Sequence, residues 1–169
     1  MSDQITKHGK SADAFDRDSW ETPQWLFDWL NETFCFTLDA AANTDNYKCF
    51  RFCTPEQSGL EKDWGQETVY CNPPYSRGMK KKFLDKARSE KQATSVFVVP
   101  ALPSEGWFPH DASMIIWITG GRVGFVNPLT GEENPNPPSG TCVVIFSPLH
   151  FGTTTYTPCD RDWETSFTW

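Results

Sequence analysis

The stretch VYCNPPYSRGMKKK, residues 69–82, passes from a short apolar run to a dense basic one through two consecutive prolines. Neither proline can donate a backbone hydrogen bond, so the pair ends a strand and prevents a helix from starting immediately. We therefore expect TVYCN (68–72) to form a buried strand that ends at Asn72. An amide, a rigid turn and the ring of Tyr75 then stand at the mouth of that strand.

Helix and strand patterns alternate on both sides of this turn. After it, Met79, Phe83 and Ala87 repeat every four residues, which predicts an amphipathic helix from Met79 to about Lys91. Well before it, Pro23 suits the first position of a helix that Thr22 can cap. Further apolar runs predict strands: about five residues ending at Asp39, a short one within 48–53, and longer ones within 94–102, 114–119 and 141–148.

This order of elements predicts an α/β fold. MIIWITGGRVGFVNP (114–128) is typical of a strand, a Gly-Gly turn and a second extended segment, so we expect an antiparallel hairpin near the C-terminal end of the sheet. Residues 1–18 are polar without a hydrophobic period and are predicted to be a flexible tail. Residues 19–150 are expected to form a single compact domain, followed by an irregular extension at 151–169.

Length and charge limit the classes of function. A chain of 169 residues that is 38% hydrophobic and 15% aromatic fits one packed domain. The formal charge of −7 argues against a protein that coats nucleic acid through bulk electrostatics, yet seven of the 15 basic residues lie between Arg77 and Lys91. This basic run is either a local DNA-binding patch or a solvated helix face.

Metal sites and membrane spans are not indicated by the sequence. The six cysteines form no CxxC pair and only three histidines are present, so no zinc-ligand spacing can be assembled and no metal is expected. Without a signal peptide or a long apolar span, we expect a cytoplasmic protein with reduced thiols and no membrane partner.

The residues of the turn suit a specific chemistry. In open α/β sheets, ligands bind beyond the carboxyl ends of the strands, where Asn72 and Asp39 are both expected. An amide oxygen and a nearby proline carbonyl can together accept both hydrogens of one amino group, and Tyr75 can stack on the flat ring that carries it. Such acceptors stabilise the positive charge that develops on a nucleobase amine as a methyl group arrives. Methylation of this kind needs no metal and no strong base.

Asn-Pro-Pro-Tyr after a hydrophobic run resembles the catalytic signature of the amino-methyltransferases that use S-adenosylmethionine. A wider ordered set, spanning roughly residues 20–148, resembles the phage DNA N-6-adenine methyltransferases, the Dam-like family: WETPQWLF, FTLDAAAN, GLEKDW, VYCNPPYS and GGRVGFV. The resemblance implies a Rossmann-like S-adenosylmethionine-dependent methyltransferase sheet. It also implies transfer of a methyl group from that cofactor to the N6 amino group of adenine in DNA.

The resemblance further implies roles for individual residues. A flipped adenine would be held and stacked by Asn72, Pro73, Pro74 and Tyr75. The cofactor would be bound by Thr22, Pro23, Asp39, Ala40, Ala41, Ala42, Asp63 and Trp64. The first cofactor loop, DAAAN, lacks the glycines of larger relatives, and no clear acidic residue follows the second strand for the cofactor ribose, where Asp45 is the candidate.

DNA contacts are expected from Lys80, Lys81 and Lys82, and from Arg122, which can instead pair with a surface carboxylate. Sequence readout is expected from loops, namely 127–140 and the segment around Arg122. A second Asn-Pro-Pro begins at Asn136, but it follows TGEENP, which cannot be a buried strand, and is predicted to be a loop turn.

Several alternatives stay open at this point. Asn72 can simply end a strand, and Asp39 can simply cap a helix. The same acceptors would also serve methylation of cytosine N4, of adenine in RNA or of a protein glutamine. A non-catalytic nucleic-acid-binding domain of the same fold is the alternative from another class of function.

Overall fold

A computed structural model of the chain describes residues 17–149 and 155–160. A 3₁₀ turn, η1 (Arg17–Ser19), precedes the first helix. The remaining elements follow in chain order: α1 (Gln24–Phe34), β1 (Leu38–Asp39), β2 (Thr68–Cys71), α2 (Met79–Ser89), β3 (Thr94–Pro100), β4 (Met114–Thr119), β5 (Thr141–Phe146) and β6 (Thr155–Asp160). The predicted α/β class is confirmed.

All strands belong to one sheet, in the order β1-β2-β3-β5-β4-β6. β1, β2 and β3 are parallel, β5 is antiparallel to both of its neighbours, and β6 is parallel to β4. The carboxyl ends of β1 to β4 therefore meet at one side of the sheet, which we call the carboxyl edge. Because β5 runs the other way, its first residue, Thr141, lies opposite Pro100 at this same edge.

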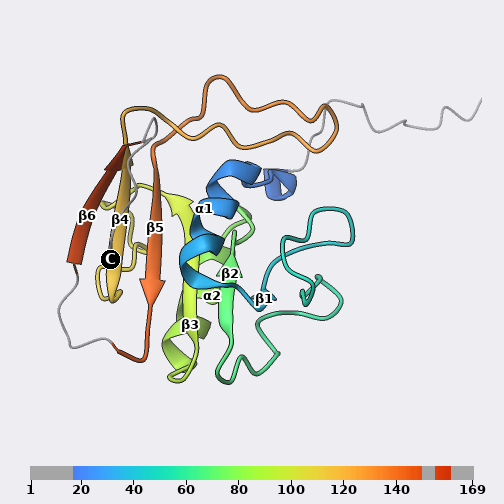
Figure 1. The fold of residues 1–169 in the computed structure, drawn as a ribbon, viewed down its shortest axis with the longest axis vertical. Helices are drawn as coiled ribbons and strands as arrows, with labels where there is room; N and C mark the ends of the chain where they lie inside the picture. The colour runs from blue at the N-terminus through green and yellow to red at the C-terminus, as the bar shows by residue number, and fades with distance from the viewer. Residues whose placement is uncertain (1–16, 150–154, 161–169) are drawn as a thin grey trace, which may run out of the picture.

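The two helices cover opposite faces of the sheet, since alternate residues of the central strands pack against different helices. Val96 and Val98 of β3 pack in a cluster with α1. Phe97 and Val99 pack in a second cluster with α2. All four side chains are fully buried, which explains why TSVFVVP is an almost continuous apolar run. In Figure 1, α1 lies in front of the sheet.

The predicted hairpin is partly wrong. β4 does have an antiparallel partner, but that partner is β5, which residues 120–140 separate from it. The segment after Gly120 instead crosses above α1 (Figure 1), where Val126 forms isolated bridges with Glu21 and Glu133. The physical reason is burial: the first five residues of TCVVIF are buried between β3 and β4, whereas RVGFVN is only partly apolar.

The prediction of an irregular C-terminal extension at 151–169 is also wrong for six residues. Thr155–Asp160 form β6, paired with the whole of β4. The sequence TYTPCD hides this strand because Pro158 cannot donate a ladder hydrogen bond. A proline is tolerated on an outermost strand, and β6 ends the sheet. Residues 150–154 and 161–169, and residues 1–16 of the predicted tail, lie outside the described residues.

Four local predictions need correction. β1 has two residues rather than about five, and residues 48–53 contribute only an isolated bridge from Phe52 to Asp39. Pro23 occupies the N-cap of α1, and Thr22 does not cap it. The Thr22 hydroxyl is used elsewhere, as the acceptor of the Tyr70 phenol. No helix in the described ranges has both the length and the apolarity to cross a membrane.

Candidate active site

Asn72 follows β2 directly and has an unusual hydrogen-bonding state. Its Nδ2 donates to the backbone carbonyl of Trp20 over 3.0 Å. Its Oδ1 is buried, and in the described part of the chain it is the one buried side-chain N or O atom without a hydrogen-bond partner. An unpaired buried acceptor costs roughly 1–3 kcal/mol, so such atoms are rare unless a ligand completes them. The Trp20 contact orients the amide so that its oxygen is the free atom.

The turn after Asn72 is fixed from two directions. β2 lies between β1 and β3, with Cys71 opposite Phe97, so the strand end is held inside the sheet. The segment before α1 crosses the turn: Asp18 accepts the backbone N–H of Ser76 over 2.6 Å. Sequence reasoning missed Trp20 and Asp18, because nothing local links them to a turn fifty residues away.

A narrow crevice of about 20 Å³ lies on one side of Asn72. It is lined by Trp20, Glu21, Thr22, Asp39, Ala41, Asn46, Lys48, Tyr70 and Asn72. Asp39 is only 2% exposed and accepts the backbone N–H groups of Ala41 (3.2 Å) and Lys48 (3.0 Å). Burial raises the pKa of Asp39 to about 6, and these hydrogen bonds and the Lys48 charge offset the effect only partly. The crevice thus brings together a buried carboxylate and an unpaired amide oxygen.

A larger cavity of about 480 Å³ lies beside the Pro-Pro-Tyr turn. It is lined by Trp20, Tyr75, Pro100, Val123, Phe125, Asn134, Pro137, Pro138, Ser139 and Thr141. Tyr75 meets Phe125 edge-on, with ring centroids 6.4 Å apart and planes at 90°. Burial raises the pKa of the Tyr75 phenol to about 12, so the ring stays neutral. Flat, apolar walls of this kind suit a planar aromatic ligand. Trp20 lines both spaces.

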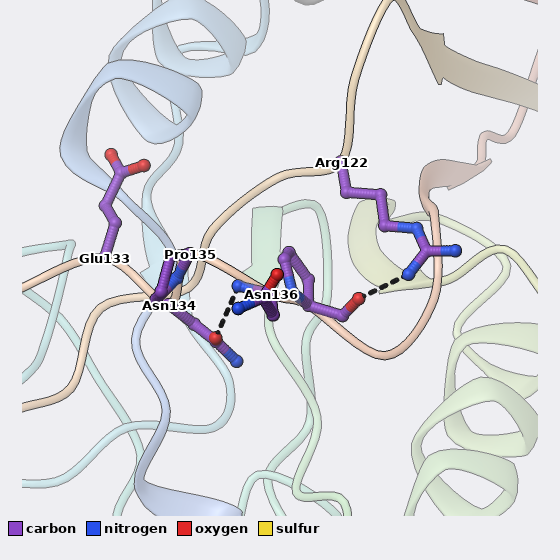
Figure 2. Close-up of a pocket in the computed structure, with 6 residues that line it drawn as sticks. Arg122, Glu133, Asn134, Pro135 and Asn136 are labelled. Atoms are coloured by element: carbon purple, nitrogen blue, oxygen red, sulfur yellow. Dashed lines mark hydrogen bonds between the residues drawn. The ribbon is translucent and has the colours of Figure 1, made fainter.

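The second Asn-Pro-Pro lies in a loop, as predicted, yet it reaches the site. Pro137 and Pro138 line the Tyr75 cavity. Figure 2 shows how the loop is held: the Arg122 guanidinium donates to the carbonyl of Pro137 over 2.7 Å, and Asn134 Oδ1 accepts the backbone N–H of Asn136. A neighbouring pocket of about 400 Å³ is lined by Arg122, Glu133, Asn134, Pro135, Asn136 and Pro137. The loop proposed for sequence readout therefore borders the predicted adenine site.

Other predicted cofactor residues do not line the crevice. Trp64 is completely buried, and its indole N–H donates to the carbonyl of Gly59 over 2.9 Å. Asp63 is exposed and accepts the N–H of Gly65. Pro23 and Ala40 are buried and each adjoins a crevice residue in the chain. Asp45 is exposed, in the turn 44–46. GLEKDW (59–64) thus contributes the core residue Trp64 and the closely packed Gly59. Direct cofactor contact by Asp63 stays a prediction.

That close contact joins Gly59 to the first loop. A Cβ on Gly59 would lie 2.1 Å from the carbonyl oxygen of Ala40. Gly59→Ala is therefore expected to displace the loop that carries Asp39, lowering the free energy of unfolding by about 1–3 kcal/mol or more. Thermal unfolding measures the loss of stability, and cofactor titration measures how the displaced loop changes cofactor affinity. Gly106→Ala is the matched control, because its added Cβ meets nothing within 4 Å; equal behaviour of the two variants would contradict the packing argument.

The lysines of α2 differ from one another. Lys81 pairs with Asp85 over 2.5 Å, and Lys86 pairs with Glu90. Lys82 is exposed and has no ion pair in the part of the chain that the structure describes. Lys80 turns back towards Tyr75, with Nζ 5.0 Å from the ring centroid. The basic run is therefore not one uniform solvated face.

Comparison with known proteins identifies the family. The family model described as DNA N-6-adenine-methyltransferase (Dam) matches residues 9–164. The chain belongs to this family. It is 36% identical over 141 residues to the DNA N-6-adenine-methyltransferase of Haemophilus phage HP1 (strain HP1c1), covering 79% of this chain and 80% of that protein. It is 30% identical over 157 residues to the protein of the same name from Escherichia phage T1, covering 80% of this chain and 65% of that one.

The Dam family assignment confirms the resemblance drawn from the motifs. The matched residues extend beyond both ends of the 20–148 range and include β6. In the described ranges, no group of three or more His, Cys, Asp or Glu side chains is placed to hold a metal ion.

Proposed function

We propose that this Dam-family protein transfers a methyl group from S-adenosylmethionine to the N6 amino group of adenine in DNA. The observation that carries the proposal is the state of Asn72 Oδ1, a buried acceptor without a hydrogen-bond partner among the described residues, at a turn that two spaces border. One space holds a buried carboxylate, and the other has aromatic walls. Asn72 lines the crevice but not the aromatic cavity, so the amine of a base stacked on Tyr75 would have to extend to the Asn72 side of the turn to complete the hydrogen bonding of Oδ1.

Asn72 acts on the amine. The lone pair of an exocyclic adenine nitrogen is delocalised into the ring, which makes the nitrogen a poor nucleophile. By accepting one N–H, with a proline carbonyl of the turn accepting the other, Oδ1 favours tetrahedral nitrogen and stabilises the positive charge that develops on it. Tyr75 stacks on the flipped base, and the rigid prolines hold both groups in register. The amine loses a proton to solvent afterwards, so no strong base is required.

The crevice residues have the chemistry to hold the cofactor. Asp39 is a buried carboxylate with no salt bridge among the described residues, and S-adenosylmethionine carries an ammonium and a sulfonium. We assign Thr22, Asp39 and Ala41 to cofactor binding, in a Rossmann-like sheet of the S-adenosylmethionine-dependent type. When bound, the cofactor supplies the methyl group. About 20 Å³ admits a group no larger than a water molecule, so the crevice as it stands is smaller than the cofactor.

DNA adenine is preferred over the other planar amines because both relatives carry that activity in their names. Cytosine N4, RNA adenine and a glutamine amide would meet the same acceptors. The host cell cytoplasm is the expected place of action for a protein with phage relatives.

The test is a transfer assay with purified protein and S-adenosylmethionine labelled in its methyl group. DNA, RNA and a glutamine-containing peptide are offered separately, and the labelled product is digested and separated. We expect label in N6-methyladenine from DNA. Label in N4-methylcytosine, in RNA or in the peptide would select an alternative substrate, and binding of DNA without any transfer would select the non-catalytic function.

Exposed lysines of α2 are proposed to dock the DNA backbone, together with Arg122. Replacing both Lys81 and Lys82 with glutamine is expected to weaken DNA binding at low salt and to reduce the slope of log affinity against log salt by about one to two. Cofactor affinity should be unchanged, because the buried side of α2 (Phe83, Leu84 and Ala87) is untouched. Fluorescence anisotropy across a salt series measures the slope. Lys91→Gln, beyond the end of α2, is the control, and a double variant with the wild-type slope would place DNA docking elsewhere.

A further inference from the structure

We propose that Lys80 is a positioning residue that holds the ring of Tyr75 in place for the flipped base, rather than a phosphate contact. This inference rests on the proposed function. Lys80 Nζ lies 5.0 Å from the centroid of the Tyr75 ring and 5.5 Å from that of Trp107, and it donates to the carbonyl of Tyr75 over 3.4 Å. An ammonium placed against two aromatic faces is stabilised electrostatically by both.

Lys80 contacts the Tyr75 ring without lining the cavity proposed for the base. Tyr75 and Phe125 both line the space of about 480 Å³, whereas Lys80 and Trp107 do not. Phe125 constrains the same ring edge-on, at 90°. Lys80 and Phe125 thus both contact the Tyr75 ring, and Lys80 does so without lining the space proposed for the base.

The local structure brings Lys80 to this position. Gly78 adopts a left-handed conformation with φ 82°, and α2 begins at the next residue. Lys80 is then the second residue of the helix, with its side chain directed back to the turn it has just left. Its partial burial lowers the pKa of Lys80, while Asp18 and Glu105 act in the opposite direction. The neighbouring Lys81 and Lys82 are exposed, so the three lysines have different surroundings.

The two roles for Lys80 predict different kinetics. If the ammonium positions Tyr75, removing it loosens the base and lowers the rate of the chemical step, because the amine and the methyl group are less well aligned. A phosphate contact would instead set DNA affinity and its dependence on salt. The two outcomes can be separated in one set of variants.

The variants are Lys80→Met, which keeps a long side chain without charge, and Lys80→Arg, which keeps a cation able to lie against aromatic rings. Lys91→Gln controls for the loss of one positive charge. We expect Lys80→Met to lower the single-turnover methyl-transfer rate about tenfold, with an unchanged salt slope for DNA binding, and Lys80→Arg to restore most of the rate. The fluorescence of 2-aminopurine, placed at an adenine that the wild type methylates, should change in Lys80→Met and not in Lys91→Gln. A normal rate with a shallower salt slope would overturn the proposal in favour of a phosphate contact.

The contact between Lys80 and the Tyr75 ring can also be tested by a measurement that does not depend on methyl transfer. In the free protein, Lys80→Met should shift the aromatic proton resonances of Tyr75 and Trp107, and Lys91→Gln should not. Unshifted Tyr75 resonances would overturn the proposal whatever the activity of the enzyme. Failure of the wild type to methylate DNA would instead overturn the proposed function, so the two failures are distinguishable.

Discussion

Replacing Asn72 with alanine is expected to lower the single-turnover rate of methyl transfer by about 100-fold or more, equivalent to roughly 3 kcal/mol of transition-state stabilisation. A large effect is expected because, in the proposed mechanism, Oδ1 accepts the amine, and it is the one buried side-chain N or O atom among the described residues without a hydrogen-bond partner. Cofactor affinity should be nearly unchanged. The free energy of unfolding should also change little, because the variant loses the bond to Trp20 but also removes an unpaired buried oxygen.

Asn72→Asp separates the two functions of the amide. A carboxylate keeps an acceptor for the amine, but it has no N–H to donate to the carbonyl of Trp20. We therefore expect a rate between those of the wild type and the alanine variant. Rapid-quench measurement with enzyme in excess of DNA isolates the chemical step, and near-normal transfer by Asn72→Ala would show that the catalytic assignment is wrong.

The second large effect is expected at Asp39. Asp39→Asn should weaken binding of S-adenosylmethionine at least tenfold at pH 8, because a neutral amide cannot pair with a cationic ligand. The same variant should unfold less readily than the wild type. Burial raises the pKa of Asp39 from 3.8 to about 6, so its ionised form costs the folded state up to about 3 kcal/mol above pH 6, a cost that disappears below pH 3.8. The gain should be smaller than this limit, since an amide oxygen and an NH₂ cannot both accept the N–H groups of Ala41 and Lys48.

The pH dependence of cofactor binding follows from the same group. Below about pH 6, Asp39 in the free protein takes up a proton and loses its charge, so affinity should fall as pH decreases from 8 to 5. Calorimetric titration across this range should show the fall in the wild type and a nearly flat profile in Asp39→Asn. Asp63→Ala is measured alongside as a separate test, because cofactor contact by Asp63 is also predicted, although its carboxylate is exposed and accepts the N–H of Gly65. Wild-type affinity in Asp39→Asn would exclude Asp39 from the cofactor site.

Several features of the fold and site could be predicted from contiguous residues. Apolar runs such as TSVFVVP and the four-residue repeat of α2 reflect the surfaces those elements bury, so their types and approximate limits can be read along the chain. The placement of Asn72 at a strand end follows from the backbone chemistry of two prolines. The ordered motifs indicated the family. Each element and each single motif depends on residues within a few positions of one another, and only the order of the motifs extends along the chain.

Contacts between distant segments were decided by the tertiary structure. Burial of an apolar strand placed β5 between β3 and β4 and left Gly120–Gly121 without a hairpin, while β6 joined the edge despite Pro158. Packing also buried Trp64 in the core. The carbonyl of Trp20, which orients the Asn72 amide, and the loop of the second Asn-Pro-Pro meet the turn only when the sheet has assembled. Local sequence determines which groups stand at a strand end, but the partners that orient them depend on which distant surfaces pack together, because burial free energy depends on the whole fold rather than on neighbouring residues.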